Sequence, residues 1–267
     1  MPKLRPATAA GGKILSRLRN TKEITMLLFG KRYIGRSYNG YHICRLMGQG
    51  RYGACFEAVA PDGREVVLKR FHNRMKKKNR GKNHFEPVIL STLSHPSVPS
   101  LLGIINAGKD YFFVLEKMPG DSIETMIFSK RHKFSQTEIY RIGLELIDII
   151  SYLHANNVVH RDIRPSNVLW DGSRVSLLDF GLARFLDEGR YHPSSDFSYL
   201  ADFLLYLCYS SYSGKKARKK SWCEELDLRP GQTIFLKRLF GTEPPYETIS
   251  QIRRDFQEFF VPSDSPD

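Results

Sequence analysis

The stretch His160–Asn167 (HRDIRPSN), followed twelve residues after its asparagine by Asp179–Gly181 (DFG), decides the fold expected for this 267-residue chain. An aspartate and an asparagine five residues apart, and then a second aspartate beside a glycine, are the groups that metal-assisted phosphoryl transfer requires. Asp162 can accept the proton of an attacking hydroxyl, while Asn167 and Asp179 can hold the cations that bridge the phosphates. The complete string, in this order and spacing, predicts a site for phosphoryl transfer from a nucleoside triphosphate.

A glycine-rich string lies upstream at Gly48–Gly53 (GQGRYG) and has the form G-x-G-x-x-G. Dinucleotide-binding folds place this string before a helix, whereas here the strand-like Ala54–Val59 (ACFEAV) follows it. By itself the string is also compatible with an ordinary turn. Sixteen residues after Gly53, however, a second strand ends in Lys69, which can reach the α- and β-phosphates of a nucleotide. We therefore expect a hairpin whose glycines let backbone N–H groups approach phosphates.

A lysine in this role needs a carboxylate partner. Between Glu65 and Asp110 the only acidic residue is Glu86. Pro87 follows it and biases the backbone of Glu86 away from the helical region. Two alternatives stay open: a helix begins here with Pro87 in its first turn, or the Lys69–Glu86 pair forms only in some states of the protein.

The order of the predicted elements indicates an α+β fold. Strand patterns cover residues 41–46, 54–60, 65–71 and 111–116, with one helix over 85–93 between them. After Met118–Gly120, apolar residues recur at helical spacing over 123–129, 135–155, 197–209, 232–240 and 248–260. We therefore expect a small β-rich lobe (41–117) and a larger, mainly helical lobe (118–261), with a basic N-terminal extension (1–40) and a short tail (262–267).

The net charge of +13 favours acidic partners. It is concentrated in residues 74–82 (RMKKKNRGK) and 215–220 (KKARKK). The plain interpretation is two solvated loops; the alternative is attraction to an acidic protein face or an anionic membrane surface. Neither cluster interleaves the aromatic residues expected of a nucleic-acid groove, so we predict no specific nucleic-acid partner. Residues 15–29 could form a short amphipathic helix with basic residues on its other face.

Composition also bounds the location of the chain. No apolar run approaches the ~20 residues of a membrane span, and the N-terminus lacks the apolar core of a secretion signal. The four cysteines show no C-x-x-C spacing, which disfavours a zinc site or a disulfide framework. We expect a cytoplasmic protein, compatible with a peripheral position at the inner membrane face through its basic segments.

On these motifs the chain resembles the eukaryotic-type (Hanks-type) protein kinases over roughly residues 41–261. Asp196, in a D-x-x-x-L-A string, is similar to the aspartate of the buried helix in the large lobe of that family. Residues 204–226 are similar to the small soluble kinases of spore-forming Gram-positive bacteria. The resemblance implies a bilobal kinase fold and the use of ATP with Mg²⁺, or with Mn²⁺. It also implies transfer of the γ-phosphoryl group to a protein Ser/Thr hydroxyl, including autophosphorylation.

The resemblance further implies a role for each matching residue. Asp162 would be the catalytic base, and Asn167 and Asp179 would bind Mg²⁺. Lys69 would hold the triphosphate and pair with Glu86. Residues expected to contact ATP are Met47, Gly48, Gln49, Gly50, Arg51, Tyr52, Gly53, Cys55, Val67, Lys69, Glu116, Met118 and Leu169, with Asp121 or Ser122 near the ribose and Leu115 as gatekeeper. An apolar spine would contain His160, Phe180 and Leu90.

Two features depart from the family pattern. Arg164, which we place among the catalytic residues, stands where serine/threonine kinases carry a lysine, and its planar fork is not equivalent to a point charge. Some tyrosine kinases carry arginine here, so the acceptor hydroxyl stays open although family likeness favours Ser/Thr. In addition, only fourteen residues (182–195) precede Asp196, and no A-P-E occurs among them.

This short segment leaves its regulation and the substrate open. Tyr191, Ser194 or Ser195 could be phosphorylated, with Arg161 receiving the phosphate; we favour a segment that needs no phosphorylation to become ordered. The missing peptide platform also leaves a small-molecule kinase on the same fold as an alternative to a protein kinase. A third alternative is a non-catalytic pseudokinase or scaffold.

Overall fold

The computed structural model describes residues 32–49, 53–71, 85–108, 110–187, 189–214 and 220–262. Two compact units make up the chain. Unit 1 contains the described residues up to Phe71 together with 102–117, and unit 2 contains 85–101 and 118–262. The amphipathic segment predicted over 15–29, the basic cluster 74–82 and nearly all of the cluster 215–220 lie outside the described residues.

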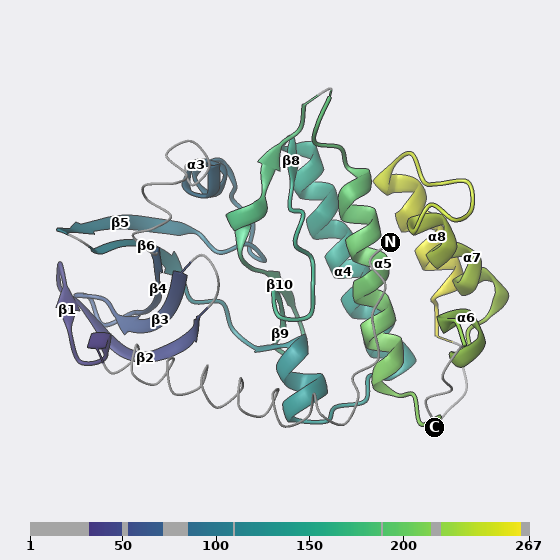
Figure 1. Ribbon diagram of the computed structural model, residues 1–267, viewed down its shortest axis with the longest axis horizontal. Coiled ribbons are helices and arrows are strands. Elements are labelled where there is room, and N and C mark those ends of the chain that lie inside the picture. Colours follow the sequence, from purple (N-terminus) through teal and green to yellow (C-terminus); the bar gives the residue numbers. More distant parts are fainter. Residues whose placement is uncertain are drawn as a thin grey trace, which may run out of the picture. The chain divides into compact units, whose positions relative to one another are not determined.

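Unit 1 is built on a six-stranded sheet in the order β1-β2-β3-β4-β6-β5 (Figure 1). The pairs β1–β2, β2–β3, β3–β4 and β4–β6 are antiparallel. The strands are β1 (Ser37–Tyr38), β2 (Tyr41–Gln49), β3 (Gly53–Val59), β4 (Glu65–Phe71), β5 (Leu101–Ala107) and β6 (Asp110–Glu116). The predicted strands are confirmed, and β5 is an addition. Sequence reasoning missed it because Leu102 and Ile104 are exposed on this edge strand, so its apolar residues face both sides.

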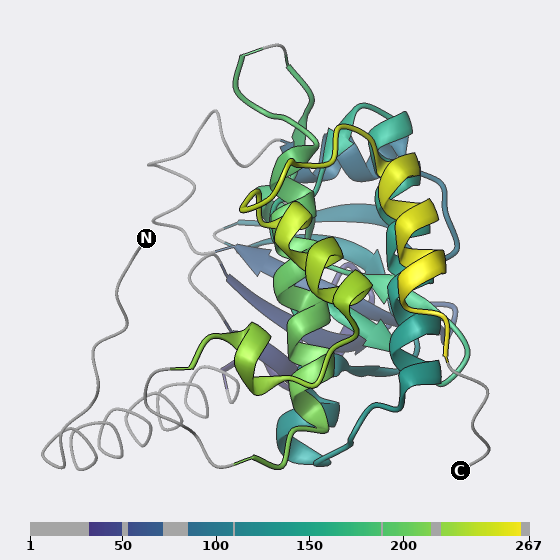
Figure 2. The ribbon, with the colours of Figure 1, turned by 90° about the vertical axis from the view of Figure 1, so that its right-hand side faces the viewer.

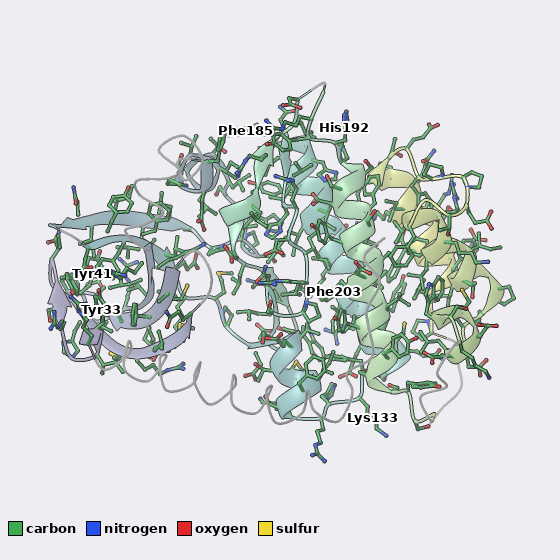
Figure 3. All side chains as sticks on the ribbon, viewed as in Figure 1. Tyr33, Tyr41, Lys133, Phe185, His192 and Phe203 are labelled. Atoms are coloured by element: carbon green, nitrogen blue, oxygen red, sulfur yellow. The ribbon has the colours of Figure 1, made fainter. Side chains whose placement is uncertain are left out.

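One face of this sheet forms the core of unit 1. Side chains alternate along each strand, and those on this face are almost completely buried: Ala54, Phe56, Ala58, Val66, Leu68, Phe112 and Val114. Tyr33, which precedes the first strand, belongs to the same core and is 1% exposed (Figure 3). Its ring packs against Phe56 with centroids 5.4 Å apart.

A polar cluster fixes the segment around Tyr33 to the sheet. The Asp110 carboxylate accepts hydrogen bonds from the hydroxyls of Tyr33 (3.2 Å) and Tyr38 (3.3 Å) and from Arg70 Nε (2.9 Å). The Arg70 guanidinium lies 4.8 Å from the centroid of the Tyr33 ring. Burial first, and then the Asp110 charge, raise the pKa of the Tyr38 hydroxyl, so it stays a donor to that carboxylate. The last residues of the predicted N-terminal extension are therefore packed into unit 1.

Unit 2 is mainly helical. Its helices are α3 (Phe85–Thr92), α4 (Gln136–Ala155), α5 (Ser194–Ser210), α6 (Trp222–Glu225), α7 (Pro230–Leu239) and α8 (Ile249–Phe259), with a π-helix at Thr125–Ser129 and a 3-10 turn at Phe180–Leu182. Short strands join them: β7 (Asp121–Ser122), β9 (Val168–Trp170) and β10 (Val175–Leu177) form one sheet, and β8 (Val158–Val159) pairs with β11 (Arg184–Phe185).

The long helix α4 is the centre of the packing in unit 2. It begins with a capping box, in which Ser135 and Glu138 each accept the other's backbone N–H. Figure 2 shows α8 alongside it. Gly143 permits this close approach, because a Cβ at that position would collide with the ring of Phe256. The buried residues of α4 recur at helical spacing, as the sequence predicted.

The predicted α+β fold, a β-rich part followed by a mainly helical part, is confirmed. The helix at Glu86 begins at Phe85, so Pro87 lies in its first turn, which is the first of the two alternatives for this helix. No helix in the described ranges combines the length and the apolar character needed to cross a bilayer.

Candidate active site

The loop that follows β8 in unit 2 is held by one buried carboxylate. Asp196, in the first turn of α5 and 0% exposed, accepts the backbone N–H of His160 at 2.9 Å and that of Arg161 at 2.7 Å. It also bonds His154 Nε2 at 3.0 Å. Arg161 has φ +65°, a left-handed conformation that costs energy for a residue with a side chain. The hydrogen bonds from two backbone N–H groups to one buried carboxylate offset this cost and fix the direction of the loop.

His160 connects this loop to Leu178, the residue between strand β10 and the second aspartate. Burial lowers the pKa of His160, so its imidazole is neutral. A neutral ring that donates from Nε2 to the Leu178 carbonyl (3.0 Å) can accept the Asp162 N–H at Nδ1 (3.3 Å), and both contacts are present. The ring also meets Phe180 edge to face, with centroids 4.8 Å apart. The predicted spine contact between His160 and Phe180 is confirmed.

Asp162 is fixed by the asparagine five residues further on. Asn167 Nδ2 donates to both the backbone carbonyl and the Oδ2 of Asp162, each at 2.9 Å. Arg164 Nε lies 3.5 Å from the same Oδ2, and its side chain is largely exposed. Burial raises the pKa of the Asp162 carboxyl, while the Arg164 cation and the Asn167 hydrogen bond lower it in part. The result is a half-buried carboxylate held in one orientation, as a proton acceptor requires.

Asn167 and Asp179 present oxygen atoms that suit a divalent cation. The Leu178 N–H donates to the Asn167 carbonyl at 2.7 Å, which brings Asn167 alongside the residue before Asp179. Because the Asn167 NH₂ group is directed to Asp162, its Oδ1 lies on the other side of the amide. An amide oxygen and a carboxylate are ligands that Mg²⁺ accepts, with phosphates and waters completing its shell. Within the described ranges, no group of three or more His, Cys, Asp or Glu side chains gathers in a metal-binding arrangement.

Asp179 itself has an unusual backbone. Its φ of +63° is left-handed, and its Oδ1 accepts the Gly181 N–H at 3.2 Å at the start of the 3-10 turn. Residues held in such conformations often lie at functional sites, because the surrounding structure must support their strain.

In unit 1 the strand register brings the predicted nucleotide residues onto one face of the sheet. Cys55 lies directly opposite Lys69, and Lys69 lies opposite Phe113. Val67 is two residues from Lys69 and therefore on the same face, opposite to the face that carries the core. Cys55 and Val67 are half-buried, in contrast to the fully buried side chains of the core face.

The glycine-rich string lies in a hairpin between β2 and β3, where Gly48 pairs with Cys55 and Gln49 with Ala54. This arrangement confirms the predicted hairpin and excludes the strand–helix context of a dinucleotide-binding fold. Gly50, Arg51 and Tyr52 lie outside the described residues.

The other predicted site residues are divided between the two units. Met47 is exposed at an irregularity in the β2–β3 register, and Glu116 ends β6 in unit 1. In unit 2, Met118 is buried, Leu169 pairs with Ser122 between β9 and β7, and Glu86 is buried in the first turn of α3.

Sequence reasoning missed two contributors to this arrangement. His154, on the last turn of α4, bonds Asp196 from 42 residues away and belongs to no motif. Tyr191 offers a hydroxyl that could be phosphorylated, but in the structure its ring packs on the Arg161 guanidinium, which lies 4.7 Å from the ring centroid. Neither contact leaves a signal in local sequence spacing.

Comparison with known proteins identifies relatives of this chain. The family model described as the protein kinase domain matches residues 41–217. The probable serine/threonine-protein kinase YbdM of Bacillus subtilis is 33% identical over 225 residues, which are 80% of this chain and 87% of that protein. The cysteine-rich receptor-like protein kinases 2 and 37 of Arabidopsis thaliana are 28% and 30% identical over 69% and 72% of this chain. The chain spans less than a third of those plant proteins, namely 29% and 31% of their length.

Proposed function

Because the chain belongs to the protein kinase family, we propose that it transfers the γ-phosphoryl group of ATP to a serine or threonine hydroxyl of a protein, including its own. The observation that carries the proposal is the hydrogen-bonded arrangement of Asp162 and Asn167 on a loop held by Asp196. It supplies a fixed proton acceptor and, beside it, an amide oxygen for a cation.

Asp162 acts as the base that accepts the proton of the attacking hydroxyl. Asn167 orients its carboxylate through the 2.9 Å hydrogen bond from Nδ2 and binds Mg²⁺ through Oδ1. The Asp179 carboxylate is the second protein ligand. Mg²⁺, or Mn²⁺, neutralises charge on the phosphate oxygens when it is bound. Arg164, next to Asp162 and largely exposed, is available to a phosphate or to the acceptor.

ATP is held by the face of the unit 1 sheet that is opposite to its core. Lys69 contacts the phosphates and pairs with Glu86, while Cys55, Val67 and Leu169 contact the adenine. The remaining contacts are made by Met47, by the glycine-rich residues Gly48, Gln49, Gly50, Arg51, Tyr52 and Gly53, and by the backbone of Glu116 and Met118. The register that sets Cys55, Val67 and Lys69 on one face supports this assignment.

The acceptor class is inferred from relatives. YbdM carries the name of a probable serine/threonine-protein kinase, and this supports Ser/Thr over Tyr in spite of Arg164. An acidic face on the protein substrate, contact of the basic segments with an anionic membrane and a cytoplasmic location stay predictions.

The experiment is phosphoryl transfer by the full chain with ATP labelled at the γ-phosphate and Mg²⁺ or Mn²⁺, followed by phosphopeptide mapping. We expect label on serine or threonine of protein, and a loss of at least about 1,000-fold in kcat for Asp162→Asn, since the base is removed. The matched control is Asp227→Asn, an exposed aspartate of unit 2, which should keep the wild-type rate.

Each alternative has its own outcome. Label on a metabolite pool and none on protein would indicate a small-molecule kinase. Nucleotide binding without turnover under either metal would indicate a pseudokinase. Label confined to tyrosine would overturn the acceptor class, and transfer that survives Asp162→Asn would overturn the role of Asp162.

A further inference from the structure

Arg161 joins the catalytic loop to the segment that follows the DFG sequence. Its backbone N–H is bound by Asp196 at 2.7 Å, and its side chain leaves the loop from a left-handed residue. The guanidinium Nη1 donates to the Leu182 carbonyl at 3.2 Å, and the same group lies 4.7 Å from the centroid of the Tyr191 ring. One side chain thus contacts both the start and the end of the segment 182–191.

The described residues of this segment are held by contacts that need only unmodified side chains and backbone. Strand β11 pairs with β8, and the Leu186 N–H donates to the Asn157 carbonyl at 2.7 Å. Asp187 Oδ1 accepts the N–H groups of Arg190 (2.6 Å) and Tyr191 (2.9 Å), closing a turn that returns the chain to Arg161. Figure 3 labels Phe185, which belongs to β11, and His192, the residue after Tyr191.

The Tyr191 ring lies close to two cations. Arg190 is 5.6 Å from the ring centroid, in addition to Arg161 at 4.7 Å. A ring face attracts a guanidinium electrostatically, so the Tyr191 ring stabilises the positions of both arginine side chains. In proteins that are switched by phosphorylation, the phosphate commonly orders its segment by binding to an arginine. Here the Arg161 guanidinium instead packs on the ring face of an unmodified tyrosine.

We propose that Tyr191 is a positioning residue, whose ring holds Arg161 and the described residues of the segment 182–191 in place without phosphorylation. The proposal rests on the proposed function for its consequence, which is that the chain is active as synthesised. It assigns the effect to the aromatic face and not to the hydroxyl. Removing the ring should disturb the direction of Arg161 and, through the Asp162 backbone next to it, lower kcat more than it raises KM for ATP.

The first test compares full-length wild type, Tyr191→Phe and Tyr191→Ala, each treated with a phosphatase before the initial rates are measured. Tyr191→Phe keeps the ring and should lie within about twofold of wild type, while Tyr191→Ala should lose about three- to tenfold in kcat with KM for ATP little changed. Tyr199→Ala, which removes an exposed tyrosine of α5, is the matched control and should resemble wild type. Rescue by phenylalanine separates a ring contact from a modification.

The second test is amide hydrogen exchange of the same variants without ATP, and it needs no activity. Tyr191→Ala should speed exchange at Leu186 and Arg190, whose N–H groups are bonded within unit 2, whereas Tyr191→Phe should not. If wild type transfers no phosphate, the proposed function fails and the exchange data still decide the role of the ring.

Three outcomes would overturn the inference. Tyr191→Phe could be as impaired as Tyr191→Ala. Phosphatase-treated wild type could be inactive until phosphate appears on Tyr191, Ser194 or Ser195. Tyr191→Ala could match wild type both in kcat and in exchange.

Discussion

Each unit of this protein contains an aspartate that gathers several hydrogen bonds, and the two differ in what they bind. Asp196 in unit 2 accepts two consecutive backbone N–H groups and bonds a histidine. Asp110 in unit 1 accepts hydrogen bonds from side chains, namely two tyrosine hydroxyls and an arginine. A carboxylate that binds backbone fixes the path of a loop, whereas one that binds side chains fixes a segment against a sheet. Similar chemistry can therefore support catalysis in one place and stability in another.

The largest expected effect is that of Asp196→Ala. The substitution leaves the N–H groups of His160 and Arg161 without their buried acceptor and removes the partner of His154. We expect the free energy of unfolding to fall by about 3–5 kcal/mol and kcat to fall at least about 100-fold, because the Asp162 carboxylate is no longer held in place. Chemical denaturation and the phosphoryl-transfer assay measure the two effects. Asp202→Ala, which changes an exposed aspartate of the same helix, is the control. A stable, fully active Asp196→Ala protein would refute this half of the comparison.

Asp110→Ala should affect stability and leave kcat much less changed. It removes a carboxylate that pairs with Arg70, whose side chain is only 8% exposed, and weakening the pairing of a buried charge is costly. Because the Asp110 side chain is itself 19% exposed, water can partly replace it, and we expect a loss of about 2–4 kcal/mol in the free energy of unfolding, measured by chemical denaturation.

A finer pair of variants sharpens the Asp110 prediction. Tyr33→Phe removes one hydroxyl from the cluster and should cost about 1 kcal/mol in the free energy of unfolding, while Tyr41→Phe, at the start of β2, should cost close to nothing. If Asp110→Ala lowered kcat as much as Asp196→Ala does, the two aspartates would not have separate roles.

The smallest expected effect concerns the pH dependence of the proposed base. Protonation of Asp162 removes the proton acceptor, so activity falls as the pH drops through its pKa. Burial raises that pKa, which puts the loss at a higher pH than for an ordinary aspartate, and the nearby Arg164 cation lowers it in part. Arg164→Gln should therefore move the acidic limb of the kcat/KM profile to higher pH, whatever it does to the rate itself. The shift should shrink in high salt, because the Arg164 side chain is largely exposed. An acidic limb that moves to lower pH would contradict the assignment of the limb to Asp162.

Much of the fold follows from local pattern. The strand over 65–71 and the long helix starting after Ser135 were predicted nearly to the residue, because a short strand-like run and apolar residues at helical spacing are local signals. The β5 strand escaped prediction because an edge strand with exposed apolar residues has no clean alternation. The hairpin context of the glycine-rich string followed from what came after it in the sequence.

The candidate site likewise has one part that is visible in the sequence and another that only the structure shows. The pair Asp162–Asn167 is separated by five residues, so its spacing is visible in the sequence, and the structure joins the two side chains by a hydrogen bond. The partners that hold them come from far along the chain: Asp196 is 36 residues from His160 and 42 from His154. Spacing carries no information about such contacts, since they depend on how α4 and α5 pack.

The sequence by itself determined the chemical groups, their order and the local elements that carry them, since these depend on residue type and short-range periodicity. Only the tertiary structure decided which carboxylate supports a left-handed Arg161, which ring covers its guanidinium and how Tyr33 joins a core that begins before the first predicted strand. The physical reason is that each of these contacts is made when helices and strands distant in the sequence are brought together by burial of their apolar faces, and hydrogen bonds and ring contacts then select one arrangement among the packed ones.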